Sequence, residues 1–274
     1  MNTLWMSIEL IKFGIISGIF LGISFAFTAP FLILRKNSLF PHALTHILFF
    51  AILSVSALPL ISSELLQYFL IFGIAMLASS SILLFKRLRI YEDTATAIIT
   101  HFFLALGLII AAKTSRYDAR LLSYLFGSII GITKIELYQS IFLLAMTLLL
   151  FFKFSPLWTT QTTDEAVPGV NFQLANFFYL SLLTFQILTG IKVMGILLVS
   201  VFFVFSGAMA LKLGKTLKKV ILFTGLFNIF GVLGGVLLSV FWDLPFSAAV
   251  VVFMGACFFT TSVLKELKNR GRIR

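Results

Sequence analysis

The stretch that decides the fold is residues 193–211, which read VMGILLVSVFFVFSGAMAL. It has no charged residue over 19 positions, and as a helix rising about 1.5 Å per residue it would be about 28 Å long. That length matches the hydrocarbon core of a bilayer, which is about 30 Å thick. We therefore expect a helix that crosses a membrane.

The rest of the chain has the same character. Of its 274 residues, 60% are hydrophobic and only 11% are charged, and the mean hydropathy is +1.09. A soluble globular fold could not bury this much apolar surface. The predicted fold is all-α, a transmembrane bundle of about eight to nine spans with a short re-entrant or packed segment, in a single domain covering residues 1–274.

Apolar runs predict where the chain crosses the bilayer. They cover residues 13–34, 43–61, 66–85, 94–112, 137–152, 173–190, 193–211, 220–241 and 244–264. Glycines 14, 18 and 22 recur on one face of the first run, which lets a neighbouring helix approach closely. Residues 121–133 are apolar but too short to cross, so we expect them to dip in and pack against protein.

The basic residues indicate the orientation. If the N-terminus faces outward, 15 of the 21 Lys and Arg residues fall on the cytoplasmic side and six on the other, as the positive-inside tendency predicts. A net charge of +11 could also suggest nucleic acid, but these residues form short clusters between apolar runs and no continuous basic face. The sequence therefore predicts a multi-pass protein of the cell (inner) membrane that binds no nucleic acid.

The three histidines are the candidate metal ligands. His42 and His46 are four residues apart in the second run, just after Pro41, so that both rings share one helical face and could bind one divalent cation. His101 lies at a comparable depth in a run of the same direction and could join them. The alternative is that His42 sits at the membrane interface while His46 and His101 are packed, hydrogen-bonded residues.

Other chemistry finds little support in the sequence. No carboxylate lies in the middle of a predicted span, which argues against a proton-driven carrier. The tripeptide Gly214-Lys215-Thr216 resembles the end of a phosphate-binding loop, but Met209 occupies the position of the required first glycine. No hydrolase motif is present, and Cys257 is isolated, so we expect neither an enzyme, nor a nucleotide site, nor a permanently bound cofactor.

Four segments carry a family resemblance. They are residues 35–46 (RKNSLFPHALTH), 123–127 (SYLFG), 195–219 and 242–247 (WDLPFS). In this order they resemble the permease subunit of zinc, manganese and iron ABC importers. The resemblance implies a helical permease that dimerises, receives metal from an extracytoplasmic binding protein and is driven by a separate cytoplasmic ATP-binding subunit.

The resemblance also assigns roles to residues. His42 and His46 match a family pattern in which an acidic residue precedes the histidine by four positions, so His42 here replaces the acid. Two imidazoles favour zinc, whereas a carboxylate would suit manganese better. Arg120 falls where relatives often have aspartate, with Asp118 nearby.

Contact with the ATPase is expected at two places. Residues 206–219 match the coupling turn of the family, although Ser206 and Gly207 replace its usual proline and alanine, and we expect residues 207–219 to contact the ATPase. The candidate contact residues there are Gly207, Lys212, Lys215, Lys218 and Lys219. The loop 163–169, with Asp164 and Glu165, is a second candidate. The lysines also suit a role as positive-inside anchors, and the two roles are compatible.

These observations favour a permease subunit, either a homodimer or half of a heterodimer, that passes zinc, or alternatively manganese or iron, into the cytoplasm. A self-contained metal channel or carrier without an ATPase is the second hypothesis, and a membrane enzyme is the third.

Overall fold

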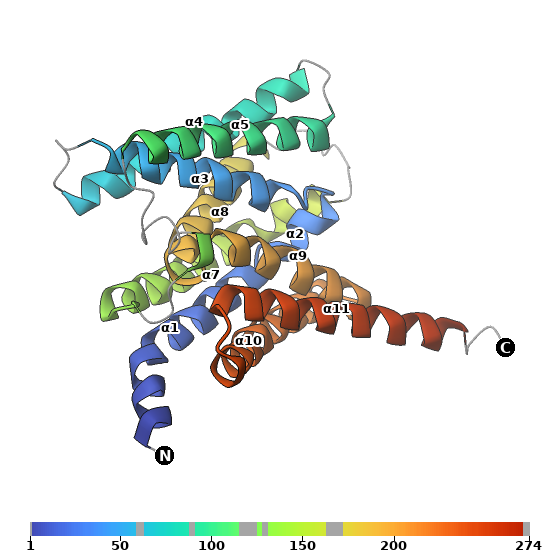
Figure 1. Cartoon of the computed structure of the whole chain (residues 1–274). Coiled ribbons are helices and arrows are strands. Elements are labelled where there is room, and N and C mark those ends of the chain that lie inside the picture. Colours follow the sequence, from blue (N-terminus) through green and yellow to red (C-terminus); the bar gives the residue numbers. More distant parts are fainter. Residues whose placement is uncertain are drawn as a thin grey trace.

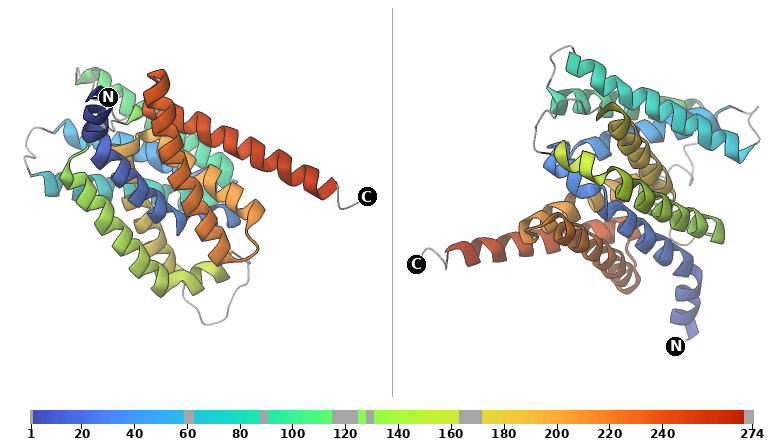
Figure 2. Two further views of the ribbon diagram at one scale, coloured as in Figure 1. Left: turned by 90° about the horizontal axis from the view of Figure 1, so that it is seen from below. Right: turned by 180° about the vertical axis from the view of Figure 1, so that it is seen from behind.

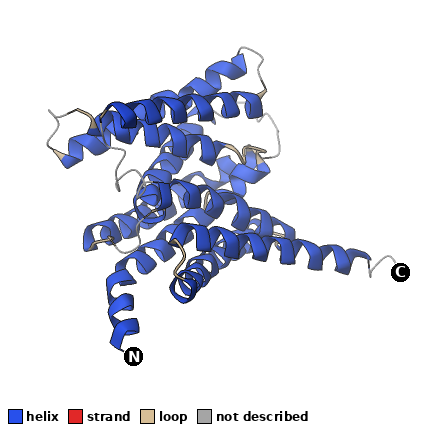
Figure 3. Cartoon of the chain, in the orientation of Figure 1, coloured by secondary structure: helices blue, strands red, loops and turns tan. Residues whose placement is uncertain are grey.

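The structure is a computed structural model that describes residues 2–58, 63–87, 91–114, 125–127, 131–162 and 172–270. Within these residues all regular structure is helical and no strand occurs (Figure 3). The helices are α1 (Asn2–Ala26), α2 (Ala29–Leu34), α3 (Phe40–Ser56), α4 (Glu64–Arg87), α5 (Glu92–Lys113), α7 (Lys134–Thr160), α8 (Phe172–Met194), α9 (Ile196–Leu213), α10 (Leu217–Trp242) and α11 (Phe246–Arg270). The predicted all-α fold is therefore confirmed.

Six described helices are long and apolar enough to cross a membrane: α5, α7, α8, α9, α10 and α11. Three further apolar stretches, Ile11–Ala26, Phe40–Ser56 and Glu64–Ser80, are shorter. The chain is a multi-pass membrane protein, and every expected apolar run overlaps at least one described helix. The count of eight to nine spans, and the single domain, remain predictions.

The helices form three groups (Figure 1). Helices α3, α4 and α5 pack together along one edge, and α10 and α11 pack together along the opposite edge. Between them lie α2, α7, α8 and α9, whereas α1 packs against α10 and α7, and its N-terminal part extends beyond α10 and α11 in Figure 1 and in the view from behind in Figure 2. The C-terminal end of α11 projects away from the bundle in these views.

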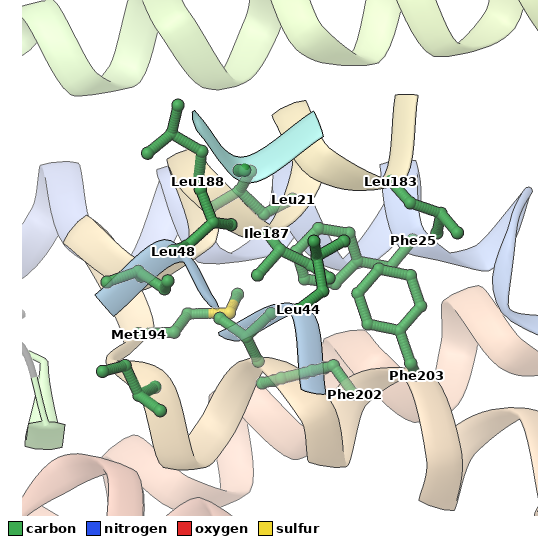
Figure 4. Close-up of a cluster of buried hydrophobic side chains, with 14 of the residues drawn as sticks. Leu21, Phe25, Leu44, Leu48, Leu183, Ile187, Leu188, Met194, Phe202 and Phe203 are labelled. Atoms are coloured by element: carbon green, nitrogen blue, oxygen red, sulfur yellow. The ribbon is translucent and has the colours of Figure 1, made fainter. Parts of the chain in front are cut away.

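Helices α8 and α9 form the centre of the bundle. In α8, 61% of the most apolar stretch is buried, against 22% in α7 and in α11. The core around them takes Leu21 and Phe25 from α1 and Leu44 from α3 (Figure 4). The rings of Phe25 and Phe203 stack with their centroids 4.6 Å apart. Large apolar side chains on the outer helices remain exposed, as expected for surfaces that face lipid.

The predicted first span, residues 13–34, is wrong as a single helix, because the chain breaks at Phe27 and Thr28 between α1 and α2. The cause is Pro30, which has no N–H and whose ring would clash with the carbonyl four residues earlier. The predicted packing of the glycine face on this helix is seen at Gly18 and Gly22, which lie against Val232 and Asn228 of α10.

A second break separates α8 from α9 at Gly195, whose backbone has φ +81° and ψ 163°. Gly127, with φ +72°, lies directly against this break. A Cβ on Gly127 would lie 2.4 Å from the carbonyl carbon of Met194, so only glycine allows the two backbones to meet. Leu125–Gly127 thus packs against protein, as expected for segment 121–133, whose residues 121–124 and 128–130 lie outside the described ones.

Candidate functional site

The first turn of α3 positions the histidine pair. Pro41 lies in that turn, where its missing N–H costs no helical hydrogen bond. The four-residue spacing brings the rings of His42 and His46 together, with centroids 4.5 Å apart and planes at 69°. The His42 side chain is exposed, whereas His46 is only 8% exposed. The pair therefore reaches from the surface of α3 into its packed side.

The hydrogen bonds of His46 decide which nitrogen is available for a metal. Its Nδ1 lies 2.9 Å from the main-chain carbonyl oxygen of His42. A carbonyl oxygen only accepts, so Nδ1 carries the proton and Nε2 keeps the lone pair of the neutral ring. This is the arrangement in which a carbonyl orients a metal-binding imidazole through the nitrogen that does not bind the metal.

His101 lies on α5, the helix packed most extensively against α3. The close approach depends on Gly107, where a Cβ would lie 2.9 Å from the ring of Phe49. His101 is exposed and interacts electrostatically with both His42 and His46. Nevertheless, in the described part of the chain no three His, Cys, Asp or Glu side chains gather closely enough to hold a metal ion. The pair supplies two ligands, and His101 stands near them without completing the site.

The predicted coupling residues divide into buried and exposed ones. Gly207 is buried, and a Cβ there would lie 2.7 Å from Ile33 of α2. Lys212 donates to the hydroxyl of Ser262 on α11, and its ammonium lies 4.5 Å from the ring centroid of Phe258. These two positions therefore connect α9 to its neighbouring helices.

The exposed coupling residues lie at the turn between α9 and α10. This turn, residues 214–216, begins α10 with Thr216, whose hydroxyl accepts from the main-chain N–H of Lys219 at 3.4 Å. Lys215, Lys218 and Lys219 are exposed around it and form the accessible basic surface of this turn. The other predicted charged positions, Asp164, Glu165, Asp118 and Arg120, lie outside the described residues.

Arg35 is one of the basic residues that indicated the orientation. The structure gives it a further role, because it connects three helices. It follows α2 and donates to the carbonyl oxygen of Trp158 at 3.2 Å and to the side-chain oxygen of Gln161 at 2.7 Å. Its guanidinium lies 4.7 Å from the ring centroid of Tyr179. Burial lowers the pKa of this guanidinium from its ordinary value and Tyr179 partly offsets the change, but arginine remains charged at neutral pH. Arg35 thus ties the end of α2 to α7 and α8.

Residues 7–265 match the ABC 3 transport family. The chain belongs to this family. The match runs through the histidine pair, both helix breaks and the turn between α9 and α10. As a member of the ABC 3 transport family the chain is a membrane permease and not itself an enzyme, and the resemblance noted in the sequence is confirmed.

The similarity to known proteins covers nearly the whole chain. The high-affinity zinc uptake system membrane protein ZnuB of Buchnera aphidicola subsp. Schizaphis graminum is 29% identical over 263 residues, covering 94% of this chain and 99% of the relative. The manganese transport system membrane protein MntC of Listeria monocytogenes is 25% identical, covering 93% and 90%. PsaBC from Streptococcus pneumoniae, solved in complex with Fab, shares the fold with a TM-score of 0.83, 22% identity and 95% coverage of each chain.

Proposed function

We propose that this permease is the membrane-spanning subunit of an ATP-driven divalent metal importer in the cell (inner) membrane, with zinc as its main substrate. The observation that carries the proposal is the histidine pair on α3, in which Nδ1 of His46 is held by a carbonyl while Nε2 keeps its lone pair. Neutral imidazole is a preferred zinc ligand, and a pair without a carboxylate favours zinc over manganese. The names of the zinc-uptake relatives agree with this choice.

The exposed histidines support a dimer. His42 and His101 are both exposed in the single chain, although polar side chains in a membrane are costly unless they face protein or water. A second copy of the chain covering this face would enclose the pair and, with water, complete the ligand set of the passing ion. We therefore propose a homodimer with the metal path along its interface.

The energy source in this proposal is a separate cytoplasmic ATP-binding subunit, with an extracytoplasmic protein delivering the metal. Gly214-Lys215-Thr216 forms a turn between two membrane helices, whereas a phosphate-binding loop joins a strand to a helix. The basic turn with Lys215, Lys218 and Lys219 is the proposed ATPase contact, and the loop holding Asp164 and Glu165 is a second one. Gly207 and Lys212 would transmit movement to α2 and α11 through their contacts.

Uptake of radioactive zinc by cells that lack their own zinc importers tests the metal site. His46→Ala should abolish uptake while the amount of folded permease in the membrane stays the same, because alanine removes the ligand and is a favourable residue within the helix α3. Normal zinc uptake by His46→Ala would eliminate this site.

The second hypothesis, a self-contained metal channel or carrier, is tested by purification. Mild detergent extraction of the native permease should recover an ATP-binding subunit with it. Recovery of the permease alone, under conditions that preserve other ABC transporters, would favour the self-contained channel.

A further inference from the structure

Thr45 lies between the two histidines of the pair and is fully buried. Its hydroxyl donates to the carbonyl oxygen of His42 at 2.7 Å. The Oγ1 atom of this hydroxyl lies 3.3 Å from Nδ1 of His46. Two groups therefore converge on the His42 carbonyl, the hydroxyl of Thr45 and the ring nitrogen of His46.

The positions of the protons follow from these contacts. The hydroxyl hydrogen of Thr45 points to the His42 carbonyl, so that a lone pair of the hydroxyl oxygen is available to Nδ1–H. All three contacts are favourable only if Nδ1 carries the hydrogen. With the hydrogen on Nε2, the lone pair of Nδ1 would face the lone pairs of the carbonyl at 2.9 Å.

We propose that Thr45 is a positioning residue of the metal path, whose hydroxyl, together with the His42 carbonyl, holds the His46 ring in the orientation that presents Nε2 to the metal. This inference rests on the proposed function of the histidine pair. Removal of such an outer hydrogen-bond partner typically costs 10–100-fold in metal affinity. Because the His42 carbonyl remains, we expect a loss near the lower end of that range.

The chain provides a matched control for an ordinary helical threonine. Thr224 on α10 is also fully buried, and its hydroxyl donates to the carbonyl of Val220 at 2.8 Å. None of its described hydrogen bonds involves a histidine. Valine has the shape of threonine without the hydroxyl, so Thr45→Val and Thr224→Val remove the same group at the two sites.

The test measures Co²⁺ binding, as a spectroscopic probe for zinc, to the purified full-length permease in lipid nanodiscs. Relative to the unmodified chain, Thr45→Val should weaken Co²⁺ binding about tenfold, while Thr45→Ser and Thr224→Val should stay within about twofold. If Thr45 only supported packing, Thr45→Ser and Thr45→Val would bind Co²⁺ with equal affinity when their protein yields are equal.

Nitrogen-15 spectra of the same samples labelled at histidine add a second readout, because the chain has only three histidines to assign. The His46 signals should report hydrogen on Nδ1 in every sample, because the His42 carbonyl remains, but the Nδ1 signal should shift in Thr45→Val and stay in place in Thr45→Ser, because only valine removes the hydroxyl contact. Unchanged Co²⁺ affinity in Thr45→Val would overturn the proposal, and so would an Nδ1 signal of His46 that does not shift.

His46→Ala separates this inference from the proposed function. Loss of Co²⁺ binding in His46→Ala with normal binding in Thr45→Val would overturn only the role of Thr45. Normal Co²⁺ binding in His46→Ala would overturn both.

Discussion

Gln186 is fully buried in α8, and its amide satisfies polar groups that the break between α1 and α2 exposes. Its Nε2 donates to the carbonyl of Ser24 at 3.0 Å, and its Oε1 accepts from the hydroxyl of Thr28 at 2.7 Å. Tyr179 adds a hydrogen bond to the carbonyl of Thr28 at 3.0 Å. Gln186 was visible in the sequence as a polar residue within an apolar span, but its partners on another helix were not.

Gln186→Leu should destabilise the permease by about 1–3 kcal/mol, since it leaves the Ser24 carbonyl and the Thr28 hydroxyl without these partners inside the bundle. The unfolding midpoint in detergent measures this. Gln139→Leu, at a half-buried position of α7, serves as control and should change the midpoint little. Equal midpoints for the two variants would contradict the role of Gln186.

His42→Asp tests which ligand type sets the choice of metal. The exposed position accommodates the smaller side chain, and a carboxylate suits manganese better than imidazole does. Uptake should persist, with a higher ratio of manganese to zinc. The measurement is competitive uptake of both ions by cells lacking their own importers. A ratio equal to that of the unmodified chain would show that His42 does not select the ion.

At the scale of elements, the two helix breaks organise the bundle. Pro30 was present in the sequence as a signal for the first break, yet the apolar composition around it predicted an uninterrupted span. The break also needs donors for the carbonyls at the end of α1, and α8 supplies one, in the 3.0 Å hydrogen bond from Gln186 to the carbonyl of Ser24. Helix breaks inside a membrane depend on such tertiary partners.

Gly195→Ala should disrupt the joint between α8 and α9. Its φ of +81° and ψ of 163° lie in a region that is essentially limited to glycine, so that strain alone should cost about 1–3 kcal/mol. A Cβ there would also lie 2.3 Å from the main-chain nitrogen of Gly127. We expect a large drop in the yield of folded permease, measured by size-exclusion chromatography in detergent.

Gly73→Ala is the matched control for this substitution. Gly73 lies within α4, and a Cβ there would meet no atom within 4 Å. Alanine should therefore be neutral or stabilise the helix by up to about 1 kcal/mol. A normal yield for Gly195→Ala would show that the joint tolerates a side chain, contrary to its geometry.

At the scale of the whole molecule, contacts show which helix ends lie together, while the orientation predicted from charge stays a prediction. The ends of α2, α7 and α8 that meet at Arg35 were all predicted to be cytoplasmic. The ends of α9 and α11 also meet, where Lys265 donates to the carbonyl of Lys212 at 2.5 Å. Segments predicted on one side of the membrane thus lie together in the structure.

The proposed ATPase contact belongs to this scale. Reversing the charge of the exposed residues Lys218 and Lys219 together, Lys218→Glu with Lys219→Glu, should reduce co-purification of the ATP-binding subunit and reduce zinc uptake in parallel. Lys113→Glu is the control, because Lys113 is exposed at the end of α5 that is predicted to face outward. If the double variant still recovers the same amount of the ATP-binding subunit, Lys218 and Lys219 do not contact it and serve only to orient the chain in the membrane.

The sequence by itself determined that this is a helical membrane protein, because apolar runs of membrane length and the distribution of lysine and arginine are local properties of the chain. It also paired His42 with His46, since a four-residue spacing within one helix places both on one face. Only the tertiary structure decided the break at Phe27 and Thr28, the burial of Gly207 against α2 and the meeting of Gly127 with Gly195. It alone shows where His101 stands relative to the pair, because helix rotation and packing depend on contacts between residues far apart in the chain.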